Sequence, residues 1–326
     1  MKYVLAPLAG FTDAPFRVLC REGGADEVWT EMASAAALRR GSMPTRRLLA
    51  TMPEEGPVVC QLFGADELDV ALATEFVHKT HHDSFCSINL NAGCPMARIT
   101  RSGAGSKLME DPELTFRLLK AMKDNTDLPV TLKTRLGLRP GRVSVFEMLD
   151  AAESAGAAGI VVHARYTSQM HGGRTDLDLL AEVVRRSKIP VTGNGSVTDV
   201  ASALAMAATG VSAIMIGRAA LKEPDIFRRI REGKAAPSPD MSRAIGLCRR
   251  HVALAREFAE LLEGCPLGER LHDRDAWLLV KYKTHFLRYF SGCLGSAAIR
   301  AAIGAARSVE EAESGAMSAS CGATLQ

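Results

Sequence analysis

The segment from residue 159 to 216 carries the pattern that decides the fold. It begins with the apolar run Gly159-Ile160-Val161-Val162-His163, continues with a helical pattern at Asp178 to Arg186, and returns to the β-branched pair Val191-Thr192. A second helical pattern, Asp199 to Ala208, precedes the apolar run Ala213 to Ile216. Short apolar runs that alternate with amphipathic helices are typical of parallel strands joined by crossover helices.

The same alternation extends toward the N-terminus. The further strand-like runs are Val4 to Ala6, Glu27 to Glu31, Val58 to Phe63, Phe85 to Leu90 and Val130 to Lys133, and helical patterns include Pro112 to Lys123 and Val145 to Ala155. Eight strand-and-helix repeats predict an α/β fold, a closed (β/α)8 TIM barrel. A doubly wound open sheet is the alternative, but Pro7-Leu8-Ala9-Gly10 after the first run lacks the GxGxxG spacing of that fold.

The strand pattern stops after the eighth repeat. Residues 232–240 are rich in Gly, Ala, Pro and Ser and indicate a linker. Amphipathic helices are predicted beyond it at Ser242 to Leu262, Asp273 to Phe290 and Ser296 to Ala306. We therefore expect a catalytic barrel domain over 1–234, a linker over 235–240, a small helical bundle over 241–312 and a disordered tail over 313–326.

The composition is that of a soluble globular protein. The chain has 326 residues, 47% of them hydrophobic and 24% charged, and no apolar run reaches the roughly 18 residues of a membrane span. The N-terminus enters a strand-like segment at once, without the features of a secretory signal, so a cytoplasmic protein is expected. A net charge of +3 is too small to indicate a nucleic-acid partner without a local cluster of charges.

The cysteines indicate neither a disulfide framework nor a zinc site. The eight of them, at positions 20, 60, 86, 94, 248, 265, 293 and 321, have no paired CxxC spacing. We expect reduced thiols and no metal.

Candidate binding and catalytic residues follow almost every predicted strand, at the end where barrel enzymes carry their active sites. They are Pro7, Leu8 and Ala9; Gln61; Asn91 and Cys94; Lys133, Thr134 and Arg135; His163 and Arg165; Asn194, Gly195 and Ser196; and Gly217 and Arg218. Each has a structural explanation, such as a core amide or a turn, but their recurrence at successive strand ends favours a site. Loops after strands seven and eight commonly hold a phosphate, and Arg218 would add a bidentate charge.

Cys94 is the candidate catalytic thiol. Gly93 before it and Pro95 after it restrict the backbone, so that the sulfur can be aimed at a substrate. A lone cysteine is more often a structural residue. Its place at a strand end among the other polar groups favours catalysis.

Several motifs resemble those of a known family, the tRNA-dihydrouridine synthases, flavin enzymes that reduce specific uridines in RNA. They are Ala6 to Asp13, Asn91 to Pro95, Gly103 to Ser106, Val130 to Arg135, Val162 to Arg165, Asn194-Gly195 and Met215 to Ala220. The resemblance implies a flavin mononucleotide (FMN) bound by Pro7, Leu8, Ala9, Gln61, Lys133, Asn194, Gly195, Ser196, Gly217 and Arg218. It also implies that Asn91 and His163 are further ligands of the flavin or the uracil.

The reaction that this resemblance implies is reduction of uridine in tRNA to 5,6-dihydrouridine, with NADPH or NADH as reductant. Hydride would pass from the reduced flavin to C6, and Cys94 would supply the proton to C5. Lys133, aimed at N1 and C2=O of the flavin, would favour its reduced anion. Leu8, Asn89 and Arg98 depart from the residues frequent in the family, which are methionine, an acidic residue and lysine.

Basic residues suggest where RNA would bind. Arg274, Lys281, His285 and Arg288 recur at helical spacing in the second predicted bundle helix and would share one face. With Arg98, Arg101, Arg135 and Arg165 near the barrel mouth, this face is predicted to line a groove for an RNA backbone. The alternative is an ordinary solvated face. Trp277 and Tyr289 could stack on bases, although core packing is the stronger expectation.

Other functions remain open on the sequence alone. A flavin barrel acting on a small metabolite, similar to dihydroorotate dehydrogenase, would share Lys133 and the phosphate loops but would not need the basic bundle. A non-catalytic RNA-binding barrel would not need Cys94 together with Lys133, and a synthase acting on ribosomal RNA would share every feature. A monomer is expected.

Overall fold

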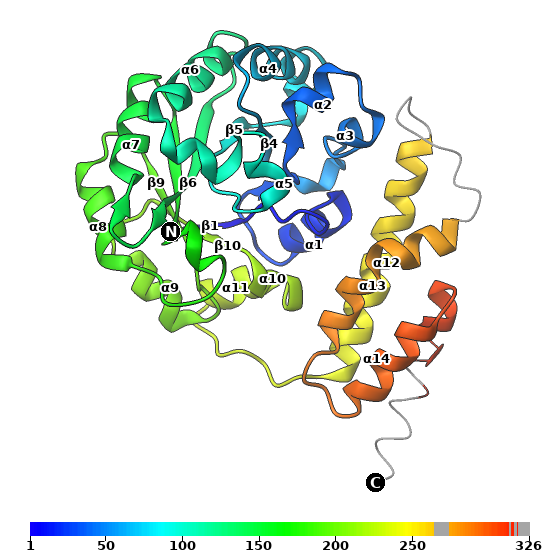
Figure 1. Ribbon diagram of the computed structural model, residues 1–326. Helices are drawn as coiled ribbons and strands as arrows, with labels where there is room; N and C mark the ends of the chain where they lie inside the picture. Colours follow the sequence, from blue (N-terminus) through cyan, green and yellow to red (C-terminus); the bar gives the residue numbers. More distant parts are fainter. Residues whose placement is uncertain (264–273, 313, 316–317, 319–326) are drawn as a thin grey trace.

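A closed barrel of parallel strands forms the body of the molecule (Figure 1). The computed structural model describes residues 1–263, 274–312, 314–315 and 318. The strands lie in the order β1-β10-β9-β8-β6-β5-β4-β2, and a parallel bridge between Val4 and Glu27 closes the ring. Their bounds are β1 (Lys2–Leu5), β2 (Val28–Trp29), β4 (Val58–Phe63), β5 (Ser87–Asn91), β6 (Val130–Arg139), β8 (Gly159–Tyr166), β9 (Val191–Asn194) and β10 (Ala213–Ile216). The predicted (β/α)8 fold is confirmed.

The second barrel strand is interrupted. Val28 pairs with Val58 and Ala33 pairs with Leu62, so this strand has one residue more than the stretch of β4 opposite. The extra residue divides it into β2 and a short β3 (Ala33–Ser34), whereas the sequence predicts one run over Glu27 to Glu31. A further short strand, β7 (Arg142–Val143), forms an antiparallel hairpin with the end of β6.

Helices surround the strands and begin at good capping residues. The side chains of Asp13, Asp66, Asp111, Asp176 and Asp199 each accept a hydrogen bond from a first-turn N–H group, at the starts of α1, α4, α6, α8 and α9. The barrel helices are α1 (Ala14–Glu22), α2 (Ala35–Arg39), α3 (Met43–Arg47), α4 (Glu67–His81), α5 (Ala97–Thr100), α6 (Pro112–Lys123), α7 (Val145–Ser154), α8 (Leu177–Arg186), α9 (Val200–Ala207), α10 (Arg218–Lys222) and α11 (Ile226–Arg231). The 3₁₀ turns are η1 (Pro53–Glu55), η2 (His82–Ser84), η3 (Gly105–Glu110) and η4 (Thr167–Gln169).

Side chains alternate between two layers of packing. Residues such as Leu62, Leu90 and Leu132 face outward and join the helices in the main hydrophobic core. Their neighbours along each strand face the barrel interior, where a smaller apolar cluster contains Val4, Ala6, Trp29, Val59, Val161 and Met215. This alternation brings polar side chains of several strands to one end of the interior.

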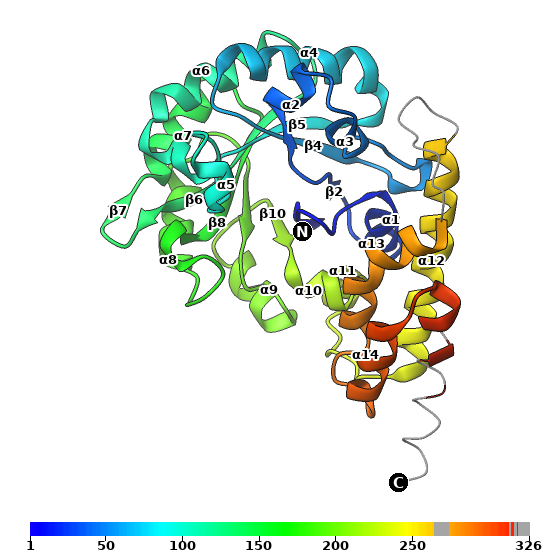
Figure 2. The ribbon, with the colours of Figure 1, turned by 45° about the vertical axis from the view of Figure 1, so that its right-hand side comes forward.

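A helical bundle lies beside α1 and α10 (Figures 1 and 2). It contains α12 (Met241–Glu263), α13 (Arg274–Tyr289) and α14 (Ser296–Ala305), close to the predicted helices, and residues 235–240 form no helix or strand. Leu254 and Phe258 of α12 belong to the main core of the barrel, while other bundle residues form a core of their own. The predicted disorder of 313–326 falls mostly outside the described residues.

None of the helices in the described part of the chain is long and apolar enough to cross a membrane.

Candidate active site

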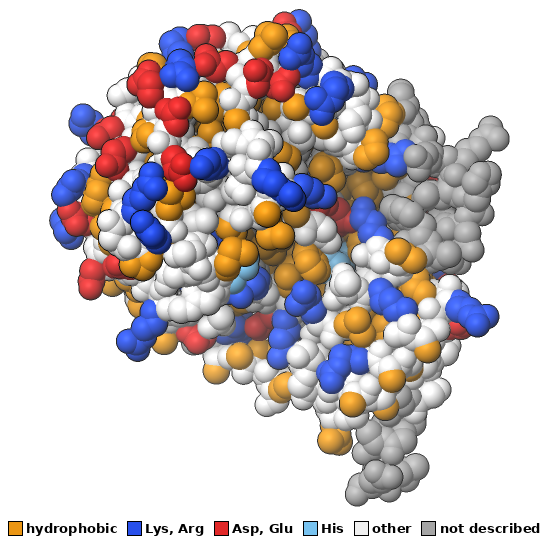
Figure 3. Space-filling model, in the orientation of Figure 1, with side chains coloured by type: hydrophobic (Ala, Val, Ile, Leu, Met, Phe, Trp, Pro, Cys, Tyr) orange, Lys and Arg blue, Asp and Glu red, His pale blue; other side chains and the backbone are white. Residues whose placement is uncertain are grey.

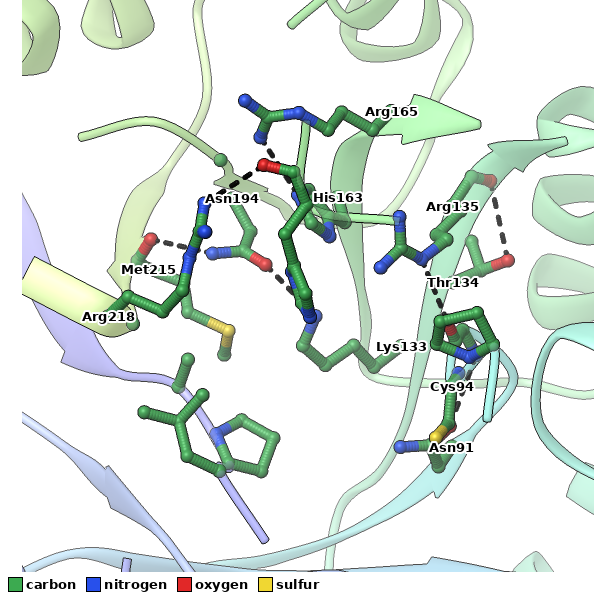
Figure 4. Close-up of a pocket in the computed structure, with 18 of the residues that line it drawn as sticks. Asn91, Cys94, Lys133, Thr134, Arg135, His163, Arg165, Asn194, Met215 and Arg218 are labelled. Atoms are coloured by element: carbon green, nitrogen blue, oxygen red, sulfur yellow. Dashed lines mark hydrogen bonds between the residues drawn. The ribbon is translucent and has the colours of Figure 1, made fainter. Parts of the chain in front are cut away.

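A cavity opens at the carboxyl ends of the barrel strands. It is lined by Pro7, Leu8, Ala9, Gln61, Asn91, Cys94, Lys133, His163, Asn194, Gly195, Ser196, Gly217 and Arg218. Figure 4 shows Lys133, Asn194 and Arg218 reaching into this space from different strand ends, with Asn91 and Cys94 at another side of it. The candidate catalytic and flavin-binding residues are therefore brought together. Met32 and His171 also line the cavity, and no sequence pattern indicates them because they lie on irregular segments.

A row of buried amides crosses the barrel interior beneath Cys94. Asn91 Oδ1 accepts from the backbone N–H groups of Gly93 (3.1 Å) and Cys94 (3.0 Å), so its Nδ2 must donate, and it donates to Gln61 Oε1 (2.9 Å). Gln61 Nε2 then donates to Asn89 Oδ1 (2.9 Å), whose Nδ2 donates to Thr131 Oγ1 (2.9 Å). The fixed direction of each bond sets the direction of the next. Asn89 is thus linked to the Cys94 loop through Gln61 and Asn91.

Replacing Asn89 by leucine should therefore weaken the fold and loosen the loop. The variant leaves Gln61 Nε2 as a buried donor without a partner, which costs about 1–3 kcal/mol in the free energy of unfolding. Urea denaturation measures this decrease. Asn125→Leu is the control, because that amide caps only the Ala121 carbonyl at the end of α6 and its removal should cost less. Equal midpoints for the wild type and Asn89→Leu would contradict the role given to the row.

Three consecutive residues of β6, Lys133 to Arg135, hold the cysteine loop in place. The N–H of Ala92 donates to the Lys133 carbonyl (2.7 Å), and Nε of Arg135 donates to the Gly93 carbonyl (2.8 Å). Thr134 Oγ1 donates to the Ala92 carbonyl (3.4 Å). Adjacent side chains of one strand therefore fix the backbone from which Cys94 projects.

A glycine at the start of η3 completes this support. Gly105 has φ of 62°, and a Cβ there would lie 2.6 Å from the Cys94 carbonyl oxygen. The next residue, Ser106, donates its N–H to that same oxygen (2.9 Å). The Gly103-to-Ser106 motif thus packs directly against the cysteine backbone, a contact that spacing alone does not reveal.

Lys133 is an unusual ammonium group. Its Nζ donates to Asn194 Oδ1 (3.1 Å), and that amide donates to the Met215 carbonyl (2.9 Å). Burial, reinforced by the Arg135 guanidinium, lowers the pKa of Lys133 to about 7. A group with this pKa changes its charge in response to an anion bound next to it.

His163 is a neutral hydrogen-bonding group in the cavity wall. Burial and the neighbouring cations Lys133, Arg135 and Arg165 hold the pKa of His163 well below its usual range. Nη1 of Arg165 lies 3.2 Å from His163 Nε2, and since guanidinium can only donate, Nε2 must accept. The ring proton is therefore on Nδ1.

The loops after β9 and β10, where the sequence predicts a phosphate site, each contain a glycine, and the loop after β9 has positive φ angles. Gly195 (φ 129°) and Ser196 (φ 55°) both have positive φ, and Ser196 is one of two such non-glycine residues in the described chain. A Cβ on Gly195 would meet the Thr175 side chain at 2.8 Å. Gly217 precedes α10 without a side-chain cap, so no side chain occupies the N–H groups of Arg218 and Ala219. The N–H of Ala220, by contrast, donates to the Gly217 carbonyl (2.9 Å).

Two of the predicted RNA-binding arginines are structural residues of the cavity. Arg135 and Arg165 are each 3% exposed. Arg135 also donates to the carbonyls of Tyr166 and Met170, and Arg165 to those of Gly172 and Gly173, so both fasten the loop after β8. Their strand positions point into the barrel, so these two side chains lie in the cavity wall and not in an exposed basic groove. Contact of either with RNA stays a prediction.

Two members of the predicted basic face of α13, Lys281 and His285, pack against the barrel. His285 is 1% exposed and packs between Phe11 and Phe16 of the barrel. Lys281 lies 3.0 Å from Asp13 Oδ2, which also accepts from the Tyr282 hydroxyl (2.6 Å). The part of this face formed by Lys281 and His285 packs against the barrel because it lies over the buried carboxylate of Asp13. The Arg274 and Trp277 side chains lie outside the described residues, and Tyr289 is buried, with its hydroxyl 3.0 Å from His251 Nδ1.

The remaining basic candidates are exposed. Arg98 and Arg101 lie on and next to α5, and the Arg288 guanidinium lies 4.9 Å from the centre of the Phe11 ring. In Figure 3, Lys and Arg side chains occur on both sides of the hollow between the barrel mouth and the bundle.

The amino-acid sequence matches a family model described as Dihydrouridine synthase (Dus) over residues 4–267. It is 33% identical to tRNA-dihydrouridine synthase B of Proteus vulgaris over 261 residues, which cover 78% of this chain and 80% of that protein. The relative of the same name in Pseudomonas putida is 34% identical over 265 residues, covering 78% and 76% of the two chains.

Solved structures with a similar backbone include morphinone reductase, with a TM-score of 0.52 and 14% identity over 74% of this chain and 88% of that one. TcOYE, solved with pHBA, gives a TM-score of 0.53 and 11% identity over 74% and 91% of the two chains. At such low identity these similarities support the barrel fold alone. The family model and the relatives confirm the resemblance seen in the sequence motifs: the chain belongs to the dihydrouridine synthase family.

Proposed function

We propose that this protein reduces uridines in tRNA to 5,6-dihydrouridine, using FMN as cofactor and NADPH or NADH as reductant. The observation that carries the proposal is the meeting of Cys94, Lys133 and the loops after β9 and β10 in one cavity. In this member of the family, a thiol, a cation with a lowered pKa and two loops suited to binding a phosphate thus line the same cavity.

The residues present fit FMN. Gly195, Ser196, Gly217 and Arg218 offer N–H groups and a guanidinium for a phosphate. Pro7, Leu8 and Ala9 form an apolar wall, and Gln61, Asn91, Lys133, His163 and Asn194 offer polar groups suited to the oxygen and nitrogen atoms of a flavin ring. When bound and reduced, the flavin supplies the hydride that uracil C6 receives.

Lys133 and Cys94 divide the remaining chemistry. Lys133 stabilises negative charge next to it, because an adjacent anion raises its lowered pKa and keeps the ammonium group protonated. Cys94 acts as the general acid and delivers its thiol proton to C5 of the uracil. The amide row and the glycine at 105 keep that sulfur at the cavity wall.

The lowered pKa of Lys133 predicts a reactive amine in flavin-free protein. With a pKa of about 7, half of the Lys133 side chains are uncharged at pH 7, about a thousandfold more than for an ordinary lysine. Labelling by an amine-reactive reagent should therefore rise through pH 7 and level off above it. Peptide mass spectrometry across a pH series measures this, with the exposed Lys107 as control. Added FMN should shift the Lys133 profile to higher pH, and profiles that coincide for the two lysines would refute the assignment.

For RNA we propose that Arg98, Arg101 and Arg288 contact backbone phosphates at the cavity mouth. All three are exposed. Removing one arginine–phosphate interaction should lower the log–log salt slope of tRNA binding by about 0.7 to 0.9. Measuring this slope after all three are replaced by glutamine tests the placement. The control replaces Arg185 and Arg186 of α8 and should leave the slope unchanged.

The whole function is tested by assaying purified protein for bound flavin and by mapping dihydrouridine in RNA from a deletion strain before and after the gene is restored. Yellow protein that releases FMN, together with restored dihydrouridine in tRNA, is the expected result. Dihydrouridine restored only in ribosomal RNA would change the substrate. Protein that neither contains nor takes up flavin would contradict the proposal as a whole.

A further inference from the structure

Two histidines and an aspartate meet at the opposite end of the barrel from the cavity. His78 lies in the last turn of α4, His82 follows one helical turn later, and Asp127 lies between α6 and β6. They join the connections that lead into the neighbouring strands β5 and β6. The proposed reaction gives them no role.

The three side chains converge on one point. Asp127 Oδ1 lies 3.0 Å from His82 Nε2 and 3.4 Å from His78 Nδ1, and one ligand atom from each residue lies within 4.8 Å of the other two. A tetrahedral ion with bonds of about 2.0–2.1 Å would separate its ligand atoms by about 3.3 Å. Both nitrogen–oxygen distances are close to that value. The two rings are perpendicular, with centroids 5.1 Å apart, and the Thr126 hydroxyl also lies 3.3 Å from His78 Nδ1, where a bound ion would replace it as the partner.

Neighbouring groups are placed as outer partners of a metal site. His82 Nδ1 lies 3.2 Å from Asp83 Oδ1, so that its other nitrogen, Nε2, faces Asp127. A carboxylate on the far nitrogen of a metal-binding histidine fixes its tautomer and raises its basicity. The histidine side chains are 36% and 43% exposed, so an ion can enter from solvent and keep a water ligand.

We propose that His78, His82 and Asp127 bind a divalent transition-metal ion of the zinc class, with water completing its coordination. Two imidazoles and one carboxylate suit Zn²⁺, Ni²⁺ or Cu²⁺, whereas Mg²⁺ and Ca²⁺ prefer oxygen ligands alone. The ion would clamp the end of α4 to the segment before β6 and so stabilise the base of the barrel. The absence of CxxC spacing predicts no metal, but these ligands are histidines and a carboxylate from segments 45 residues apart.

The test is whether metal-stripped full-length protein binds Zn²⁺. Equilibrium dialysis measures the binding, thermal unfolding measures its effect on Tm, and Mg²⁺ is the comparison ion. We expect one equivalent of Zn²⁺ and a raised Tm for the wild type. His82→Gln and His78→Gln should weaken binding by more than about 100-fold, since even an outer partner contributes 10- to 100-fold. His81→Gln, which removes the adjacent histidine outside the trio, should bind as the wild type does.

The absorption spectrum of bound Co²⁺ distinguishes binding at this site from binding at the cysteines. Co²⁺ at His78, His82 and Asp127 should give the visible absorption of a tetrahedral ion without a thiolate charge-transfer band. Binding that survives His82→Gln, a thiolate band that survives in Cys94→Ala, or no preference for Zn²⁺ over Mg²⁺ would each overturn the proposal. The substituted histidines are partly exposed, so equal Tm values without metal will show that the variants fold.

Discussion

Cys94→Ala should abolish most of the dihydrouridine formation while leaving flavin binding and its reduction by NADPH intact. The thiol is needed only when uracil C5 receives its proton, so its removal eliminates a general acid and should slow that step by about 10²- to 10⁴-fold. Single-turnover assays with reduced enzyme and tRNA measure the step directly. Stopped-flow bleaching of the flavin measures the other half-reaction and should be unchanged.

Cys86→Ala is the matched control for this variant. Cys86 is an exposed free thiol at the opposite end of β5, where it donates to the Val58 carbonyl (3.2 Å). Its removal should leave both half-reactions at the wild-type rate. If Cys94→Ala also modified tRNA at that rate, another group would have to supply the proton.

Arg17→Met should give a large decrease in the stability of the barrel. Arg17 and Glu55 form an ion pair with side chains that are 1% and 0% exposed. Arg17 also donates to the carbonyls of Thr12 (2.7 Å) and Ala50 (2.8 Å) and so supports the loop after β1. Methionine keeps the apolar stem but leaves a buried carboxylate unpaired, which costs about 3–5 kcal/mol.

Denaturant unfolding of a double-mutant cycle tests this expectation. Adding Glu55→Gln to Arg17→Met removes the uncompensated charge and should recover part of the stability. Arg39→Met breaks an ion pair with Asp69 in which the arginine is 44% exposed, and it should cost less than about 1 kcal/mol. Similar decreases for Arg17→Met and Arg39→Met would show that burial of the Arg17 pair is not what makes it important.

The barrel was predictable because its signals are local. Each strand and helix has its own period, and capping aspartates mark the starts of α1, α4, α6, α8 and α9. The candidate site followed from these boundaries, since all strands of such a barrel end on the same side. The break between β2 and β3 was not predictable, because a bulge depends on the register of the partner strand.

The basic residues of α13 were harder to place. Helical spacing correctly put Lys281, His285 and Arg288 near one face of this helix, but spacing does not say what that face contacts. The structure packs it against Asp13, where burial alone would raise the carboxyl pKa but Lys281 and the Tyr282 hydroxyl hold it below its usual range. Burial also lowers the pKa of His285 to about 4, so this residue is neutral at pH 7.

The sequence by itself determined the eight strand-and-helix units, the helical bundle after them and the residues at the strand ends, because periodicity and capping act between near neighbours. Only the tertiary structure decided which charges are buried or exposed and which distant groups meet. It put Arg135 and Arg165 inside the cavity wall, linked Asn89 to the Cys94 loop through two amides, and brought Asp127 to His82. These outcomes depend on strand register and on how helices pack, and neither is encoded in the spacing of a single segment.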